Sequence, residues 1–195
     1  MSRSLMYWQV YLHKTSLAAE KMLENLILRA RHLIAKGVNV PASPAFSHFL
    51  STVLKPGQID EDSLDQFINL DDTDIWSAIK AWQTHDDFVL SLLSKGLIDR
   101  RLFKMEMTME APAPERVEGD IAYLAATYGL DKTDAAYLTS SSTVTTNMYN
   151  ADVDSIDILY NDGTIKPITT ASDMLNLDVL SKEVCKHAYC HLRIK

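Results

Sequence analysis

The stretch LHKTSLAAEKMLENLILRARHLIAKG, residues 12–37, predicts a long amphipathic helix around which the rest of the chain can pack. Its apolar side chains recur at steps of three and four residues, so they share one face of a helix. That face comprises Leu12, Ala19, Met22, Leu23, Leu26, Ile27, Ala30, Leu33 and Ile34. Gly37 suits the position after the last turn, where a left-handed backbone is common. We therefore expect a helix from Leu5 to about Lys36 that buries one stripe.

Four shorter helices are predicted after a loop that contains Pro41 and Pro44. They are SPAFSHFLSTVL (43–54), DEDSLDQFINL (60–70), DDTDIWSAIKAWQ (71–83) and DDFVLSLLSKGLI (86–98). Three of them begin with aspartates, whose carboxylates suit the free N–H groups at the start of a helix. The first hundred residues are therefore expected to be almost entirely helical.

The second half of the chain mixes strand and helix patterns. The predicted elements are a strand LFKMEMTME (102–110), a helix ERVEGDIAYLAATYG (115–129), a weaker strand pair with a Ser-rich turn AAYLTSSSTVTTNMY (135–149), a hairpin SIDILYNDGTIKPI (155–168), a short helix LDVLSKEV (177–184) and a strand AYCHLRI (188–194). Asp162-Gly163 supports the hairpin turn. We therefore expect an α+β fold, with a helical region over residues 1–100 and a smaller mixed domain with antiparallel strands over residues 101–195.

Composition favours a globular, cytoplasmic protein. The chain of 195 residues is 47% hydrophobic and contains no apolar run long enough to span a membrane. Its only cysteines, Cys185 and Cys190, argue against a fold that is held together by disulfides. The net charge of −7 argues against nonspecific nucleic-acid binding. Residues 1–36 nevertheless contain six Lys or Arg against two Glu, which suits a small anionic ligand or a solvated helix face.

One face of the first helix is a candidate substrate-binding surface. Arg3, Tyr7 and Tyr11 are spaced by four residues, and Lys14 follows one turn later. Two cations on either side of two phenols suit an anionic ligand that contains a ring. The alternative is that the tyrosines are half-buried packing residues and the cations are solvated. His13 points away from this face, toward a different neighbour.

Aspartates near two helix starts are candidate metal ligands with a simpler interpretation. Asp71, Asp72 and Asp74 directly precede an apolar-periodic helix, so capping explains them. The pair His85-Asp86 falls in a predicted turn, where Asp86 and its neighbour are placed to cap the next helix. We interpret both groups as caps.

The C-terminal stretch CKHAYCHLR contains four further candidate metal ligands, Cys185, His187, Cys190 and His191. In a strand, alternate side chains point to opposite faces, so Cys190 lies with Ala188 while both histidines take the other face. Four ligands could not then converge on one zinc ion. We expect no metal site in this chain.

Several segments resemble, in the same order, the C-terminal half of bacterial HD-superfamily metal-dependent phosphohydrolases, relatives of dNTP triphosphohydrolases. The matching segments are VYLHKTSLAAEKML (10–23), LDDTDIWSAIKAW (70–82), DRRLFK (99–104), ILYNDGTIKPITTASDML (158–175) and LSKEV (180–184). In that family, two histidines and two aspartates of an all-helical HD domain bind a divalent metal, which activates water. The resemblance implies that residues 1–100 continue such a domain, whose metal ligands (for Mg, Mn, Ni or Fe) precede the matched segment.

The resemblance also implies roles for individual residues. Arg3 matches a phosphate-contacting arginine and Tyr11 a tyrosine near the sugar, while Tyr7 stands where the eukaryotic dNTP triphosphohydrolase of this superfamily has histidine. Four more positions, which contact regulatory nucleotides between subunits of that relative, are matched by His13, Lys14, Arg100 and Lys104. They are candidates for an oligomer-interface nucleotide site or for interface salt bridges.

The expected function is therefore a contribution to a phosphohydrolase that acts on nucleotides, most of all deoxynucleoside triphosphates. We expect a homo-oligomer that binds a nucleotide and, without the HD metal ligands, is inactive on its own. The alternative is a noncatalytic nucleotide-binding or oligomerisation module that docks on a partner subunit.

Overall fold

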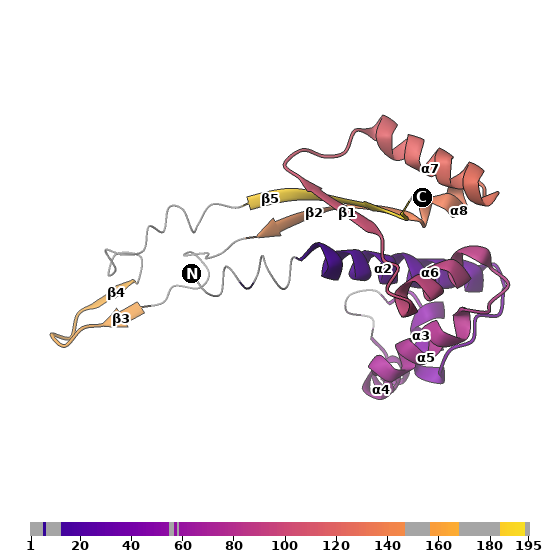
Figure 1. Cartoon of the computed structure of the whole chain (residues 1–195). Coiled ribbons are helices and arrows are strands. Elements are labelled where there is room, and N and C mark those ends of the chain that lie inside the picture. Colours follow the sequence, from indigo (N-terminus) through magenta and orange to yellow (C-terminus); the bar gives the residue numbers. More distant parts are fainter. Residues whose placement is uncertain are drawn as a thin grey trace.

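Helix α2 (Lys14–Ala35) runs through the middle of the protein, with a small sheet on one side and a group of helices on the other (Figure 1). The structure is a computed structural model, and it describes Met6 and residues 13–54, 57, 59–146, 157–167 and 184–193. The start of the predicted first helix lies outside these residues, apart from Met6. The part from residue 14 onward is confirmed.

Both ends of α2 are fixed by local hydrogen bonds. The Nδ1 atom of His13, the residue before the helix, accepts a hydrogen bond of 3.3 Å from the N–H of Thr15. At the other end Gly37 has a φ of 78°, so its N–H reaches the carbonyl of Ile34 and the N–H of Val38 reaches that of Leu33, both at 2.9 Å. This is the Schellman arrangement, and it confirms the predicted stop at Gly37.

The four shorter predicted helices are all present. They are α3 (Pro44–Ser51), α4 (Glu61–Asn69), α5 (Asp72–Trp82) and α6 (Phe88–Ile98). The carboxylates of Asp60, Asp71 and Asp87 cap α4, α5 and α6 respectively. In the reciprocal bond of a capping box, the Asp74 carboxylate accepts a hydrogen bond from the backbone N–H of Asp71. Capping is therefore confirmed for the aspartates at the start of α5.

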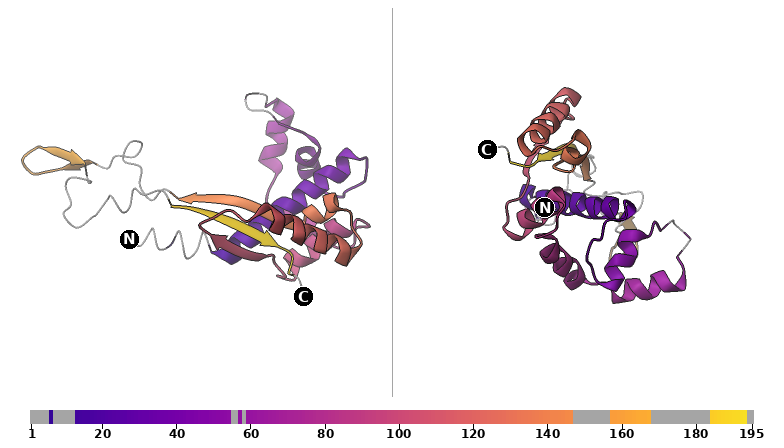
Figure 2. Two further views of the ribbon diagram at one scale, coloured as in Figure 1. Left: turned by 90° about the horizontal axis from the view of Figure 1, so that it is seen from above. Right: turned by 90° about the vertical axis from the view of Figure 1, so that its right-hand side faces the viewer.

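A three-stranded antiparallel sheet lies between α2 and α7 (Pro114–Tyr128) (Figures 1 and 2). Its strands, in the order in which they pair, are β1 (Lys104–Thr108), β5 (Val184–His191) and β2 (Thr139–Thr146). Side chains of the central strand alternate as predicted: Cys190 lies on the α2 side, near Lys21, while Tyr189 reaches Asp120 of α7. Both faces of β5 are covered, which explains its burial.

The predicted strand pair with a Ser-rich turn over residues 135–149 is wrong within the described residues. Residues 139–146 form one strand, β2, which pairs with β5 without interruption from Thr139 to Thr146. The preceding residues belong to α8 (Lys132–Ala136). Serine adopts an extended backbone readily, and β5 offers a backbone partner at every position, so the serines stay in the ladder rather than turn.

The predicted hairpin is confirmed as β3 (Asp157–Leu159) and β4 (Ile165–Pro167), which pair antiparallel. Gly163 supplies the positive φ of the turn, 83°. The predicted final strand begins earlier than expected, because β5 already starts at Val184. The rest of the predicted short helix over residues 177–184 lies outside the described residues.

One hydrophobic core joins the helices to the sheet, and the α+β class is confirmed. Its largest side chains come from both ranges of the chain, among them Met22, Trp82, Leu90, Leu138 and Cys190. Helices α2 and α6 approach closely at Gly96, where a Cβ would come within 2.2 Å of the Met22 methyl carbon. The division into domains at residue 100 stays a prediction.

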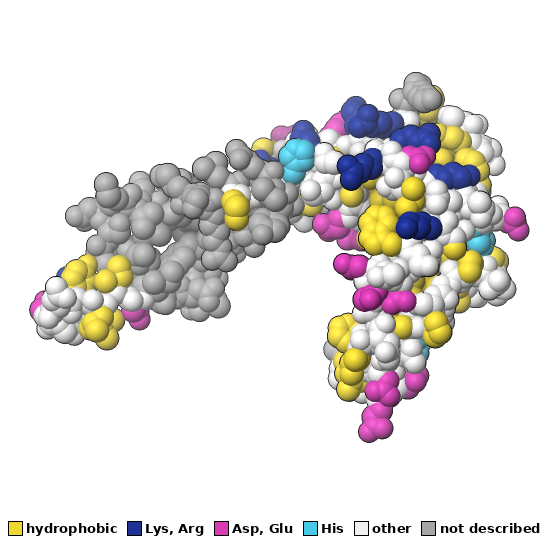
Figure 3. Space-filling view, turned by 60° about the horizontal axis from the view of Figure 1, so that its bottom comes forward, with side chains coloured by type: hydrophobic (Ala, Val, Ile, Leu, Met, Phe, Trp, Pro, Cys, Tyr) yellow, Lys and Arg dark blue, Asp and Glu magenta, His cyan; other side chains and the backbone are white. Residues whose placement is uncertain are grey.

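Helix α4 exposes more apolar surface than it buries. Leu64, Phe67 and Ile68 lie on one side of the helix and are each more than half exposed, whereas Ser63 is its one buried residue. Acidic side chains lie beside apolar ones over this part of the surface (Figure 3). No described helix is long and apolar enough to cross a membrane.

Arg29 forms the central polar contact of the fold. Its side chain is only 4% exposed, although it belongs to the apolar stripe of α2. The guanidinium donates to both oxygens of Asp87 at 3.1 and 2.6 Å, and it also bonds the carboxylate of Asp134. It lies 5.3 Å from the ring centre of Tyr137. Arg29 is one of the six Lys or Arg residues of residues 1–36, which were expected to attract an anion or to be solvated, and it is instead a buried structural residue.

Two further bonds of α2 act beside Arg29. The Asn25 amide donates to the carbonyls of Tyr137 and Thr139 at 2.9 and 2.8 Å. Burial tends to lower the pKa of Arg29, but the hydrogen bonds to Asp87 and Asp134 outweigh it and raise the pKa above its ordinary value. The guanidinium is thus charged at neutral pH and well above it.

We expect Arg29→Met to lower the free energy of unfolding by about 3–5 kcal/mol, because two carboxylates would lose their shared cation. Chemical denaturation measures the change. The control is Lys36→Met at the exposed end of the same helix, which should stay within about 0.5 kcal/mol of the unmodified protein. A loss for Arg29→Met no larger than that of the control would contradict the assigned role.

Asp87 should make stability depend on acid pH. Burial raises the pKa of its carboxyl, but the bonds from Arg29 and from the N–H of Leu90 outweigh burial, so the pKa lies below its ordinary value of 3.8. The unfolded chain then binds more protons, and the contribution is complete above about pH 4 and lost as the pH falls through the lowered pKa. Asp87→Asn keeps the helix cap, so we expect a shallower decline in its unfolding free energy between about pH 4 and pH 2. An unchanged pH profile would contradict this.

Candidate functional site

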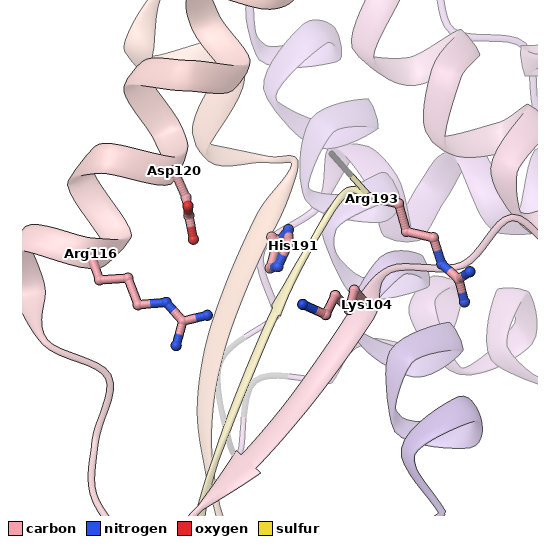
Figure 4. Close-up of a pocket in the computed structure, with 5 residues that line it drawn as sticks. All are labelled: Lys104, Arg116, Asp120, His191 and Arg193. Atoms are coloured by element: carbon pink, nitrogen blue, oxygen red, sulfur yellow. The ribbon is translucent and has the colours of Figure 1, made fainter. Parts of the chain in front are cut away.

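A cavity of about 550 Å³ opens between α7 and the sheet, on the face opposite α2 (Figure 4). Its lining residues are Lys104, Arg116, Asp120, His191 and Arg193. Arg116 and Asp120 are four residues apart on α7, so they share one face of that helix. Lys104 is the partner of His191 in the β1–β5 ladder, which brings these two side chains to one end of the sheet.

Two of the cations share one carboxylate beside the cavity. Arg116 donates to Glu106 at 2.7 Å, and Lys104 pairs with the other oxygen of the same carboxylate at 3.0 Å. The bond from Arg116, followed by that from Lys104, lowers the pKa of Glu106, so the carboxylate is ionised at neutral pH. The single negative charge of Glu106 is therefore shared between the positive charges of Arg116 and Lys104.

Tyr189 holds the acidic side of the cavity in place. Its hydroxyl donates to Asp120 at 2.8 Å, and the Arg116 guanidinium lies 5.4 Å from its ring centre. Burial and the neighbouring Asp120 carboxylate raise the pKa of Tyr189, so the phenol stays protonated and remains a donor. Asp120 is engaged by this bond, while Arg116 is oriented by both the ring and Glu106.

His191 presents one ring nitrogen to the cavity. Its Nδ1 lies 2.8 Å from the carbonyl of Leu192, and because a carbonyl only accepts, Nδ1 carries the hydrogen. Nε2 has no partner among the described residues, yet it is not one of their fully buried unsatisfied atoms. The residue is 5% exposed and lines the cavity, so Nε2 is open on that side.

The cavity suits an anion rather than a metal ion. Three cations line it, and Arg193 makes no ion pair within the described part of the chain. Across residues 13–54, 59–146, 157–167 and 184–193, no three His, Cys, Asp or Glu side chains lie close enough to hold one metal. Burial also raises the pKa of Cys190 to about 11, which keeps its thiol protonated and unreactive.

Of the residues proposed to bind substrate, only Lys14 is described. It is the first residue of α2 and is exposed; Arg3, Tyr7 and Tyr11 lie outside the described residues. His13 caps α2 through Nδ1 and is exposed as well. The cap gives His13 a local structural role and leaves its ring accessible.

The four candidate interface residues are not brought together by direct contacts. Within the described residues no hydrogen bond or ion pair joins His13 or Lys14 to the other two. Arg100 is exposed just after α6 and has a φ of 55°, a left-handed backbone that costs a non-glycine residue about 1 kcal/mol. Lys104 alone of the four lines the cavity.

The pair His85-Asp86 is not arranged as a metal site. His85 Nδ1 accepts a 2.9 Å bond from the N–H of Asp87, and Nε2 lies 3.0 Å from the carbonyl of Asn39. Both ring nitrogens are therefore occupied by backbone groups. Asp87, rather than Asp86, caps α6.

A Ser–His–Asp array that the sequence did not reveal joins α3 to α4. His48 Nε2 lies 3.0 Å from Ser63 Oγ, and Nδ1 lies 3.5 Å from Asp62. Ser63 is only 2% exposed, so its hydroxyl cannot reach a substrate carbonyl. The array holds the first turn of α4 against α3.

Most of the cavity was missed by the sequence reasoning. The register of β1 against β5 pairs residues 79 to 87 positions apart, from Thr108 with His187 to Lys104 with His191. The available signals were local: Arg116 and Asp120 share a helix face, and His191 and Arg193 fall on one face of the predicted strand over residues 188–194. Only the pairing of the strands shows that these faces meet.

Comparisons with known proteins show a close structural similarity to a solved protein. No family model matches the sequence. The chain is 35% identical over 104 residues to the uncharacterized protein YwfO of Bacillus subtilis (strain 168). These aligned residues make up 53% of this chain and 22% of YwfO. The crystal structure of a phosphohydrolase from Bacteroides thetaiotaomicron VPI-5482 matches with a TM-score of 0.91 and 46% identity, over 98% of this chain and 48% of that one. The chain thus spans about half the length of that phosphohydrolase, and the likeness supports a relation to phosphohydrolases.

We expect Tyr189→Phe to lower the free energy of unfolding by about 1.5 kcal/mol, because a buried donor to an ionised carboxylate is lost while the ring under Arg116 remains. Thermal or chemical denaturation measures this. Tyr128→Phe is the control, since that exposed hydroxyl has no hydrogen-bond partner among the described residues. Equal stability of the two variants would show that the Tyr189 bond contributes nothing.

Proposed function

We propose that this chain forms the C-terminal portion of a metal-dependent phosphohydrolase of the HD superfamily, with deoxynucleoside triphosphates as its substrates. The observation that supports the proposal is the match of nearly the whole chain to half of the Bacteroides phosphohydrolase at 46% identity. The cations at Lys14, Arg100 and Lys104 suit phosphate groups, since charge-assisted hydrogen bonds to phosphate are strong.

The described residues do not fit the divalent metal of such an enzyme. They contain no group of three His, Cys, Asp or Glu side chains that could hold one metal ion. Both ring nitrogens of His85 are hydrogen-bonded to backbone groups. In the proposal, a metal ion of the Mg, Mn, Ni or Fe type belongs to a separate HD domain. This chain contributes nucleotide binding, and it has no hydrolytic activity on its own.

The nucleotide contacts of the proposal fall into two groups. Arg3, Tyr7, Tyr11 and Lys14 contact the substrate, while His13, Lys14, Arg100 and Lys104 contact a nucleotide between subunits of a homo-oligomer. The exposed positions of His13, Lys14, Arg100 and Lys104 are compatible with such contacts.

A noncatalytic oligomerisation module is the second candidate function. The exposed apolar side of α4, formed by Leu64, Phe67 and Ile68, favours it, because surfaces of this kind commonly mediate association. Light scattering measures the oligomeric state with and without nucleotides. An oligomer that forms with increasing protein concentration and does not change when nucleotides are added would favour the module.

The hydrolysis test incubates the chain with each of the four dNTPs in the presence of Mg, Mn or Ni and measures released triphosphate and deoxynucleoside by ion-exchange chromatography. We expect no release above the metal-only reaction. Hydrolysis that disappears in His85→Ala or Asp86→Asn would contradict the proposed inactivity and place a catalytic centre in this chain.

The binding test measures dNTP affinity by calorimetry. Lys14→Gln should weaken dNTP binding about tenfold, because one charge-assisted contact to phosphate is lost. Lys36→Gln, at the far end of the same helix, should bind dNTPs as the unmodified chain does. Equal affinities for both variants, or no dNTP binding at all, would count against the proposed nucleotide role.

A further inference from the structure

We propose that the cavity between α7 and β5 binds a terminal phosphate group, and that the Glu106 carboxylate competes with this phosphate for Lys104 and Arg116. The ligand class is a hydrogen phosphate anion, either free or at the end of a phosphate ester. This inference rests on the charges and hydrogen bonds of the cavity and does not require the proposed hydrolytic function.

The first argument is the position of the two shared cations. Arg116 extends from α7 and Lys104 from β1, and both point toward the space above β5 from opposite sides, with His191 between them (Figure 4). A guanidinium can donate two parallel hydrogen bonds to one phosphate, and an ammonium adds a third. Phosphate oxygens can therefore take the place that the Glu106 carboxylate now holds between these groups.

The second argument is the balance of charge. Glu106 supplies one negative charge to both Lys104 and Arg116, and Asp120 is turned to the hydroxyl of Tyr189. Arg193 has no ion-pair partner among the described residues. A phosphate dianion brings more negative charge than a carboxylate and more acceptor oxygens, so it can satisfy cations that Glu106 only shares.

The third argument concerns His191 and selects phosphate over other anions. Because Nδ1 donates to the Leu192 carbonyl, a neutral ring has a lone pair on Nε2. That atom can accept a hydrogen bond from a protonated phosphate oxygen. Sulfate at neutral pH has no such hydrogen, so the cavity should prefer phosphate to sulfate.

The experiment measures binding of inorganic phosphate to the full chain by isothermal titration calorimetry, without metal ions and at constant ionic strength. Sulfate and dATP are titrated in parallel. We expect phosphate to bind at least tenfold more tightly than sulfate. Binding of dATP through this cavity with weaker binding of free phosphate would identify the terminal phosphate of a nucleotide as the source.

Two variants with opposite expected effects test the site. Arg116→Gln should weaken phosphate binding about tenfold. Glu106→Gln should tighten it about threefold or more, because the competing carboxylate charge is gone while the shape is kept. A gain of affinity cannot result from poor folding, so Glu106→Gln keeps the test decisive.

Arg101→Gln is the matched control. Arg101 is an exposed cation that pairs with Asp99 and does not line the cavity. Its variant should bind phosphate as the unmodified chain does. Equal losses in Arg101→Gln and Arg116→Gln, weaker binding in Glu106→Gln, or equal affinity for phosphate and sulfate would overturn the proposal. None of these outcomes depends on whether the chain hydrolyses dNTPs.

Discussion

The buried guanidinium of Arg29 is the interaction on which the arrangement of the layers depends. It sits on α2 and holds two carboxylates, one at the start of α6 and one in α8, which belong to opposite sides of the helix. A buried charge without a partner is costly, so the geometry in which both aspartates reach it is strongly favoured over alternatives. Asn25, one turn earlier on α2, donates two hydrogen bonds to backbone carbonyls of the residues that follow α8. Together they fix where the sheet meets the helices.

Much of the fold could be predicted because its signals are local. The apolar repeat of α2, the stop at Gly37, the aspartate caps and the Asp162-Gly163 turn are each set by residues within a few positions of one another. The likeness in sequence and fold to a phosphohydrolase agrees with the coarser part of the resemblance drawn from short motifs, the relation to phosphohydrolases.

The rest of the structure depends on partners that are distant in the sequence. Arg29 looked like a solvated cation because its second aspartate is 105 residues away. The serines of β2 looked like a turn because their partner strand, β5, begins only at Val184. Likewise Lys104 alone of the cavity residues was predicted to contact an anion, on a resemblance. His191 was considered only as a metal ligand, and its place beside Arg116 needed the strand register to be found.

The carboxylate of Glu106 has a consequence for how charged molecules approach this protein. Opposite charges within about 3 Å cancel at long range, and salt screens what remains beyond a Debye length of about 8 Å at physiological ionic strength. Glu106 therefore offsets one of the positive charges of the cavity, and the electrostatic steering is weaker than three unpaired cations would give. An anion that enters must then be recognised largely at contact range, by fit and hydrogen bonding, and its association rate would depend less on salt than it would without Glu106.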